Sequence, residues 1–272
     1  SFLNKAALVD VFAKIHPCQH VLIDAQQSLY IDADILDLVE EFRQSRNVRG
    51  QSPVSLLGFK DRYALQDRIE FIDFTTQELQ HRVEPEAVLE LLQEGNARFR
   101  SGWTLKRDLT RRKLETSRGQ FPLAVILSCI DSRTPVELIF DLSLGDVFSV
   151  RIAGNIAKEK ALGSMEYACA VAGAKLIVVL GHTRCGAVTA AVNLHESHQT
   201  ALQSTGCDHL DVLVSEIQKS IPAVNQRSAA GNIPPDREAF VDELARHNVM
   251  RTLRYIRTES RSLARLEQEG RI

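Results

Sequence analysis

The sequence lacks any long apolar segment. Its longest apolar runs, Leu123 to Leu127 and Leu176 to Leu180, have the length of strands and fall far short of the roughly 18 residues that cross a bilayer. No signal peptide follows Ser1, and the chain does not begin with methionine. We therefore expect a fragment of a longer protein.

Cysteine is scarce and odd in number. The five cysteines are Cys18, Cys129, Cys169, Cys185 and Cys207. So sparse a set does not predict a disulfide framework, and it favours a reducing compartment such as the cytoplasm. Each cysteine is then either a packing residue or a metal ligand.

An excess of charge of one sign is also missing. The formal net charge is -2, so nothing suggests a nucleic-acid partner. The hydrophobic share of 44% and the charged share of 25% are typical of a globular protein. A length of 272 residues suffices for one large domain or two smaller ones.

Residues 1–62 alternate between helical and strand patterns. The predicted elements are a helix over 3–15, a strand over 21–23, a helix over 35–42 and a strand over 54–57. This order favours a small α/β unit. Residues 63–83 are polar with little periodicity, and we interpret them as a linker to a larger unit over 84–272.

The unit over 84–272 alternates in the same way. Pro85 is typical of the first turn of a helix, and Thr134, Pro135 and Glu137 predict a capping box that opens a helix through Leu142. The other predicted elements are strands over 123–127, 146–152 and 175–180, and helices over 164–172, after 186 and over 236–269. Alternating strands and helices predict an α/β fold, a parallel sheet covered by helices on both faces.

Two of the predicted strands end in residue types that bind metals. Cys129, Asp131 and Arg133 follow the strand over 123–127, while His182 and Cys185 follow the strand over 175–180. Sites in open α/β sheets form beyond the carboxyl ends of strands, so we expect the two segments to meet. Two cysteines and one histidine with an open fourth position are typical of catalytic zinc.

Either half of this pattern is weak evidence by itself. Cys129 and Cys185 could be small buried hydrophobes, and His182 could be a core histidine. Asp131 and Arg133 favour the metal site, because charges directly after a buried strand must pair with each other or meet a metal. An iron–sulfur role is disfavoured because only three clear soft ligands exist.

The acidic residue beside the site has two possible roles. Asp131 can accept a hydrogen bond from the reacting water if Arg133 holds its carboxylate. It can also rotate onto the metal as a fourth ligand, which would block the reaction.

Six pieces of residues 84–272 resemble the β-class carbonic anhydrases, in that family's order. They are Gly95 to Phe99, Cys129 to Arg133, Gly145 to Arg151, Ala153 to Asn155, Ser164 to Ala168 and Gly181 to Gly186. The resemblance implies zinc-dependent, reversible hydration of carbon dioxide to bicarbonate. It implies Zn²⁺ on Cys129, His182 and Cys185, with Asp131 and Arg133 as the catalytic dyad. It further implies a carbon dioxide pocket, shared across a homodimer or higher homo-oligomer and lined by Gln120, Phe148, Tyr167 and Gly186.

Several features depart from that family's pattern. Ile152 stands where the family often has Asn, and Ile126 stands where some members carry the Trp of a regulatory bicarbonate site. Arg151 does match the arginine of that regulatory site. The chain also stops at Ile272, where the family continues into a last strand.

Residues 1–62 resemble the later part of a STAS domain, the cytoplasmic module of SulP-type anion transporters. The matching segments are Ser1 to Leu8, Val21 to Asp24 and Tyr30 to Asp34. This resemblance implies a membrane-tethered, cytoplasmic end of a bicarbonate or sulfate transporter whose transmembrane domain lies upstream. The alternative function is a non-catalytic regulatory module of such a transporter, with a structural or blocked zinc site.

The remaining candidates are weaker. His195, His198, Cys207 and His209 could form a second metal site, but their polar segment favours an exposed loop or helix. Cys169 lies in an apolar run and is predicted to be a core residue. Trp103, near Phe99, is interpreted as a packing residue.

Overall fold

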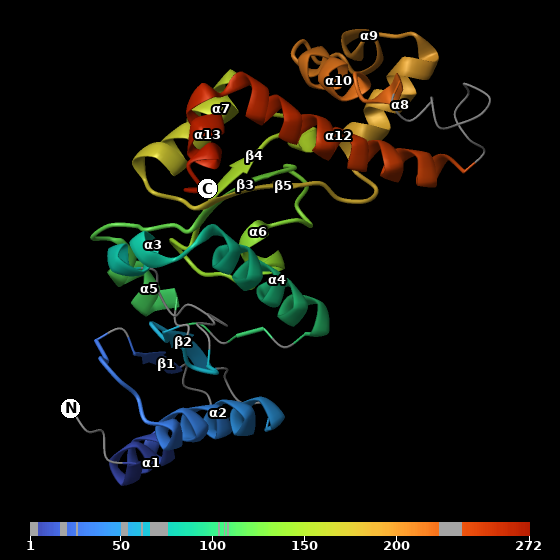
Figure 1. Ribbon diagram of the computed structural model, residues 1–272. Helices are drawn as coiled ribbons and strands as arrows, with labels where there is room; N and C mark the ends of the chain where they lie inside the picture. Colours follow the sequence, from blue (N-terminus) through green and yellow to red (C-terminus); the bar gives the residue numbers. More distant parts are fainter. Residues whose placement is uncertain are drawn as a thin grey trace.

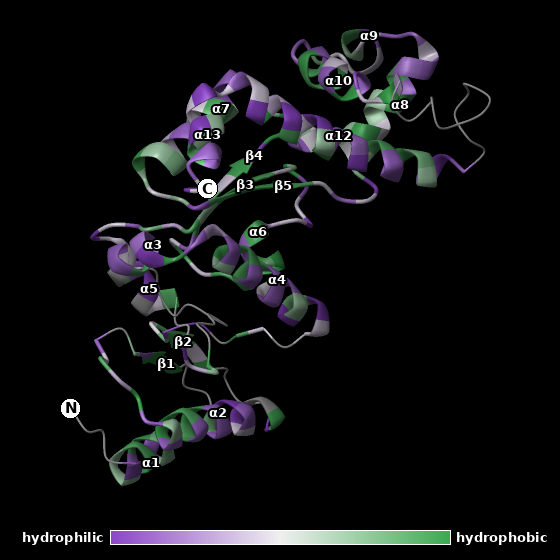
Figure 2. Ribbon diagram, viewed as in Figure 1, coloured by the Kyte–Doolittle hydropathy of each residue, from purple (hydrophilic) through white to green (hydrophobic). Residues whose placement is uncertain are grey.

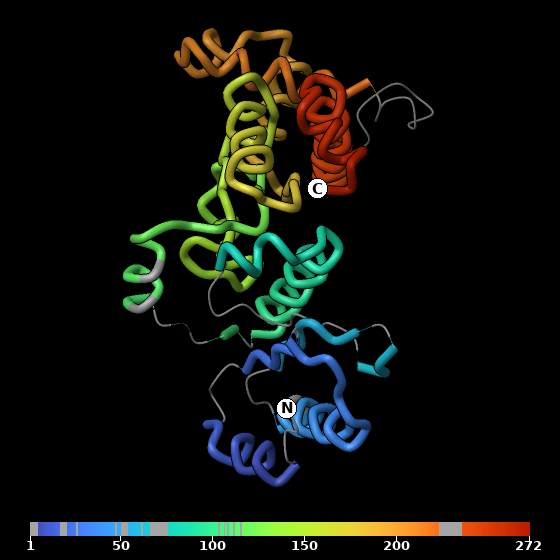
Figure 3. Tube along the Cα trace, turned by 60° about the vertical axis from the view of Figure 1, so that its left-hand side comes forward, coloured from blue at the N-terminus to red at the C-terminus, as the bar shows by residue number. Residues whose placement is uncertain are grey.

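The computed structural model describes residues 5–16, 21–25, 27–49, 54–60, 62–65, 76–102, 104–105, 107, 109–222 and 236–272. A small unit at the N-terminal end lies at one extreme of the molecule, and helices α8 to α10 lie at the other (Figures 1 and 3). A three-stranded sheet stands between them. Among the described helices, none combines the length and the apolar character that crossing a membrane requires.

The N-terminal unit has the predicted order of elements. It consists of α1 (Lys5–Lys14), β1 (Val21–Asp24), α2 (Ala33–Val48) and β2 (Val54–Leu57). The two strands pair in parallel, and the stacked rings of Phe12 and Phe42, 3.9 Å apart, join the two helices. The helix–strand–helix–strand prediction is confirmed.

The last part of the segment interpreted as a linker forms a helix, α3 (Gln77–Arg82). Thr76 caps it by accepting the Leu79 N–H. Gln80 is buried, and its Nε2 donates to the carbonyls of Pro122 and Ala172 at 2.8 Å each. This helix is therefore anchored to the two segments that lead into neighbouring strands of the larger unit's sheet.

The sheet of the larger unit is entirely parallel and has the order β4-β3-β5. Its strands are β3 (Ala124–Ser128), β4 (Val147–Arg151) and β5 (Leu176–Leu180), as predicted. Every residue of β3 is buried, which explains why that strand is an unbroken apolar run rather than an alternating one. Figure 2 shows the apolar character of these central strands.

Helices cover both faces of this sheet, as predicted (Figure 1). Alternate residues of the strands, such as Val125 and Val179, pack against α7 (Glu159–Glu166), α12 (Arg237–Glu259) and α13 (Arg261–Gln268). The intervening residues, such as Ala124 and Val178, pack against α4 (Pro85–Ser101) and the end of α3. A third cluster joins α12 to α8 (Gly186–Ser197) and α10 (Leu210–Gln218). Two shorter helices are α5 (Leu109–Thr116) and α9 (Ala201–Thr205).

The predicted capping box at Thr134 is wrong. Helix α6 spans only Val136–Ile139, and no side chain caps it. The N-cap position falls on Pro135, one residue later than predicted, and the Thr134 hydroxyl donates instead to the carbonyl of Asp131. The chain then turns through Asp141, whose left-handed φ of 48° ends the helix and whose carboxylate pairs with Arg98 at 2.5 Å.

The helix predicted over 164–172 begins earlier than expected. It starts at Glu159 as α7 and continues directly into a π-helical turn, η2 (Tyr167–Val171). Ala161, Leu162 and Met165 are buried at helical spacing, and the exposed Gly163 between them hid that spacing in the sequence. Gly173 ends the segment with a φ of 80°, as predicted.

Candidate metal centre

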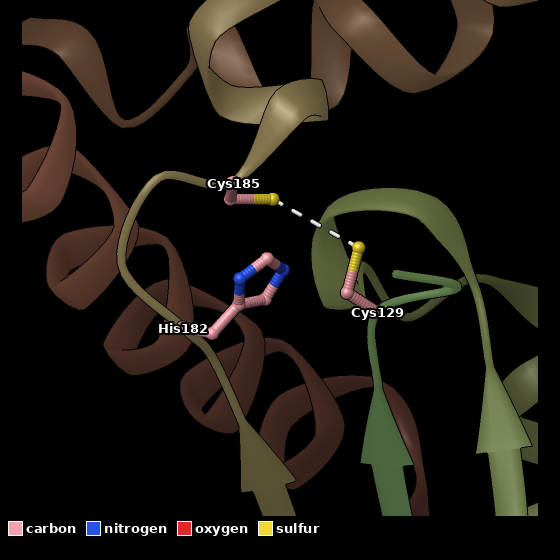
Figure 4. A group of neighbouring side chains, drawn as sticks. All are labelled: Cys129, His182 and Cys185. Atoms are coloured by element: carbon pink, nitrogen blue, oxygen red, sulfur yellow. Dashed lines mark hydrogen bonds between the residues drawn. The ribbon is translucent and has the colours of Figure 1, made fainter. Parts of the chain in front are cut away.

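Parallel pairing brings the two predicted ligand segments together. Ser128, the last residue of β3, lies opposite Leu180, the last residue of β5. Cys129 follows the first strand, and His182 and Cys185 follow the second. One ligand atom from each of these residues lies within 4.8 Å of the other two, and Figure 4 shows the three side chains converging.

The two sulfurs have the spacing that a zinc ion requires. The Sγ atoms of Cys129 and Cys185 are 3.8 Å apart. Two thiolates that each bind a tetrahedral zinc ion at about 2.3 Å also lie about 3.8 Å from each other. Both cysteines are buried and free of disulfides. The distance therefore fits a shared ion without rearrangement of either side chain.

The histidine is oriented for metal binding. His182 Nδ1 lies 2.9 Å from the carbonyl of Thr183, and because a carbonyl only accepts, this nitrogen carries the proton. The other ring nitrogen, Nε2, is buried and has no hydrogen-bond partner in the described structure. Metal-binding histidines typically donate their second N–H to a carbonyl in this way. An ion between the sulfurs would satisfy Nε2.

The two cysteine thiols also favour binding of a cation at this site. Burial, reinforced by the nearby Cys129 thiol, raises the pKa of the Cys185 thiol to about 11. Two adjacent thiolates are unfavourable here unless a positive charge compensates them. A divalent ion supplies that charge, since metal binding and loss of the thiol protons are coupled. The donor set of two sulfurs and one imidazole fits Zn²⁺.

A carboxylate is held at the edge of the metal centre. Arg133 donates to Asp131 from its backbone N–H at 3.0 Å and from Nε and a terminal nitrogen at 2.9 Å each. These bonds hold the pKa of Asp131 well below its usual range. Its Oδ2 lies 3.9 Å from His182 Nε2, so the carboxylate faces the ligands while bonded to Arg133. Asp131 is not among the residues whose ligand atoms all lie within 4.8 Å of one another.

Another arginine braces the same loop from the neighbouring strand. Arg151, at the end of β4, donates from Nε to the carbonyl of Cys129 at 3.0 Å and from a terminal nitrogen to that of Asp131 at 2.5 Å. The resemblance associated this residue with a regulatory bicarbonate site. In the structure its guanidinium binds the backbone of the metal-centre loop.

Of the residues expected to line the substrate pocket, some lie near each other or near the metal centre, and Gln120 does not. Phe148 and Tyr167 contact each other edge to face, with ring centroids 6.4 Å apart, and Gly186 directly follows Cys185. Gln120 is exposed and precedes the amino end of β3, whereas Cys129 follows the carboxyl end. A five-residue strand is roughly 16 Å long, so Gln120 belongs to the opposite end of the sheet from its own chain's metal centre.

The weaker sequence candidates do not form a site. Within the described residues, Cys129, His182 and Cys185 are the one group of three or more ligand residues close enough to share an ion. His195, His198, Cys207 and His209 therefore do not make a second metal site. Cys169 is buried in the core, as predicted, and burial raises its pKa to about 12. Trp103 lies outside the described residues.

Several supporting groups were not found by sequence reasoning. The Gly154 amide, in the short 3₁₀ turn η1 (Ala153–Asn155), donates to Cys129 Sγ at 3.4 Å. Asp242 of α12 accepts the Arg184 amide at 2.9 Å, inside the segment that carries the other two ligands. No local pattern marks these residues, because their partners are distant in sequence.

Comparisons with known proteins agree with this geometry. Residues 124–272 match the family model described as carbonic anhydrase. Carbonic anhydrase 2 of Mycobacterium tuberculosis is 47% identical over 109 residues, which are 40% of this chain and 53% of that protein. The chain spans about half the length of these curated relatives.

Solved structures share the fold. The β-carbonic anhydrase CcaA superposes with a TM-score of 0.51 and 24% identity, over 68% of this chain and 86% of that one. A tetrameric β-carbonic anhydrase from Sordaria macrospora has a TM-score of 0.50 and 23% identity, over 59% and 76%.

The match to the family model covers more than half of the chain, so the chain belongs to the carbonic anhydrase family. Its parallel sheet covered by helices is the fold of the β class. Enzymes of that class use zinc, and the three clustered ligands provide a site that fits the ion.

Proposed function

We propose that this protein catalyses the reversible hydration of carbon dioxide to bicarbonate. The observation that carries the proposal is the convergence of Cys129, His182 and Cys185 beside a carboxylate that is held by an arginine. These three residues would hold zinc, which when bound lowers the pKa of water and makes it a nucleophile near neutral pH. The catalytic dyad is Asp131 and Arg133.

The dyad orients the nucleophile. Because Arg133 keeps Asp131 ionised, the carboxylate is purely a hydrogen-bond acceptor at neutral pH. It can accept a hydrogen bond from the reacting water and so aim a lone pair of that water at carbon dioxide. Arg133 also keeps the carboxylate from rotating onto the metal, since it donates to both carboxylate oxygens. Loss of this restraint would let Asp131 become a fourth ligand and close the site.

The substrate pocket is proposed to form between two copies of the chain. Phe148, Tyr167 and Gly186 would contribute from the copy that holds the ion, and Gln120 from the other copy. The support is the position of Gln120, one strand length away from its own chain's metal centre. The exposed ring of Tyr167 is available to such a neighbour. The active form is then a homodimer or a higher assembly, as in the tetrameric relative.

The N-terminal part suggests a wider context. We propose that residues 1–62 derive from a STAS-like domain, that 63–83 link it to the carbonic anhydrase domain over 84–272, and that the parent protein is a SulP-type anion transporter. The support is the parallel β1–β2 pair with its two helices. The enzyme would then act in the cytoplasm, tethered to the membrane. In the alternative, the metal centre is blocked or structural and the domain only regulates transport.

The test combines metal analysis with a stopped-flow assay of carbon dioxide hydration. The parent should bind one zinc ion per chain and be active. Arg133→Ala should keep that zinc and lose about 10²-fold in kcat, because Asp131 is no longer held. Arg265→Ala is the matched control, since Arg265 is about as exposed as Arg133 and pairs with Glu269, which caps the end of α13.

The outcomes separate the two functions. A parent that binds zinc and is inactive at every pH would support the regulatory module. Activity of Arg133→Ala within twofold of the parent would remove the dyad from the mechanism.

A further inference from the structure

One face of helix α12 lies against the segment that carries His182 and Cys185. Asp242 accepts the amide of Arg184, which lies between these two ligands. A Cβ placed on Gly181 would come within 2.6 Å of the Val249 side chain, so the helix approaches the chain where β5 ends. The ligand segment is therefore fixed relative to α12.

The same helix also reaches the other half of the metal centre. Asn248 is completely buried, and its Nδ2 donates to the carbonyl of Gly154 at 2.7 Å. The amide of Gly154 in turn donates to the sulfur of Cys129 at 3.4 Å. The two bonds involve the peptide groups on either side of one α-carbon, so fixing the carbonyl restricts the direction of the amide.

We propose that Asn248 is a positioning residue of the metal centre, which aims the Gly154 amide at the Cys129 sulfur through the Gly154 carbonyl. The inference rests on the proposed function in one respect, namely that Cys129 binds zinc. The proposed role belongs to a residue of α12 that would touch neither the ion nor the substrate.

The proposed role follows from how thiolates bind metals. An N–H that donates to a sulfur withdraws charge from it, which stabilises the thiolate and fixes its direction. Gly154 has a left-handed φ of 69° in the turn from which its amide donates to the sulfur. Asn248 holds the carbonyl end of that residue, and the Ile217 side chain packs against its α-carbon. Loss of the Asn248 donor leaves a buried carbonyl unpaired and frees the turn to move.

The test compares Asn248→Leu with the parent. Leucine has a similar volume and lacks the donor. Thr252→Val is the matched control, because Thr252 is also buried and lies one turn further along α12. Zinc affinity is measured by competition with a chelator, and sulfur-to-metal charge transfer is measured in the cobalt-substituted proteins. Neither readout requires enzyme activity.

Asn248→Leu should bind zinc about tenfold more weakly. Its charge-transfer band should move to longer wavelength, because a sulfur without its hydrogen-bond donor holds its electrons less tightly. Thr252→Val should match the parent in both measurements. If folded Asn248→Leu also matches the parent in both, the positioning role is wrong.

A second measurement on the unmodified protein decides the matter if Asn248→Leu does not fold. In the cadmium-113 form, the Gly154 amide proton should show scalar coupling to the metal through the sulfur. Absence of that coupling overturns the proposal. A parent that binds none of the three ions would refute the proposed function itself, whereas normal binding without the coupling refutes only the role of Asn248.

Discussion

Replacement of Gly154 by alanine should destabilise the protein markedly. The residue has a φ of 69°, and a left-handed conformation costs a non-glycine residue about 1 kcal/mol. A Cβ there would lie 2.5 Å from Ile217 Cδ1 and 3.1 Å from Cγ1, in a fully buried cluster. Overpacking of this kind costs about 2 kcal/mol. We therefore expect a loss of about 3 kcal/mol in the free energy of unfolding.

A double-mutant cycle can separate the two causes. Ile217→Val removes the Cδ1 atom that the new methyl group would meet, at its own cost of about 1 kcal/mol. Once the clash is relieved, the double variant should lose about 2 kcal/mol rather than the additive 4 kcal/mol. The backbone strain of Gly154→Ala should remain in both backgrounds.

Urea unfolding followed by circular dichroism, at one protein concentration, measures these differences. Gly163→Ala is the matched control, because a Cβ there meets nothing within 4 Å and the residue lies inside α7. That control should be neutral or slightly stabilising. A Gly154→Ala variant within 0.5 kcal/mol of the parent, or strict additivity in the cycle, would refute the reasoning.

Two further predictions concern ligation and acid stability. Cys129→Ser should lose bound zinc and hydratase activity together, whereas the exposed Cys207→Ser should keep both; full zinc content in Cys129→Ser by metal analysis would exclude Cys129 as a ligand. Burial alone would raise the pKa of Glu216, but hydrogen bonds from Lys219, Lys158 and Arg251 outweigh burial and lower the pKa to about 2. The ionised Glu216 therefore stabilises the fold above its ordinary pKa of 4.5, and this stabilisation is lost as the pH falls toward 2. Glu216→Gln should therefore be less stable than the parent by about 2 kcal/mol at pH 7. Urea midpoints of the two proteins should show this stability difference narrowing between pH 5 and pH 3. A stability difference that stays constant with pH would contradict the assigned ion pairs.

The sequence predicts the sheet and the ligand cluster because both follow from local patterns. Buried parallel strands are unbroken apolar runs, and parallel strands place their carboxyl ends at one edge, so Cys129 and His182 had to meet once β3 and β5 paired. Pro85 and Gly173 mark helix ends by their own backbone preferences. These predictions needed no knowledge of distant contacts.

The predictions that failed depended on competition between partners. The helix begins one residue later than the capping pattern predicts, with Pro135 at the N-cap position, and the Thr134 hydroxyl donates to the carbonyl of Asp131. Asn248 stands in a helix rich in arginine and glutamate, and its partner is 94 residues away, so no spacing indicates the contact. Contacts of this kind are determined by tertiary packing, and sequence periodicity does not predict them.

The bracing arginine of β4 links strand alignment to chemistry. Arg151 stands opposite Ser128 in the ladder, and in that alignment its guanidinium reaches the two loop carbonyls. A slip of β4 by a single residue would turn this side chain to the other face of the sheet. The apolar side chains that fix the register of β4 thus also determine the position of the Asp131 carboxylate. A substitution in the interior of the sheet would therefore weaken catalysis without contacting the metal.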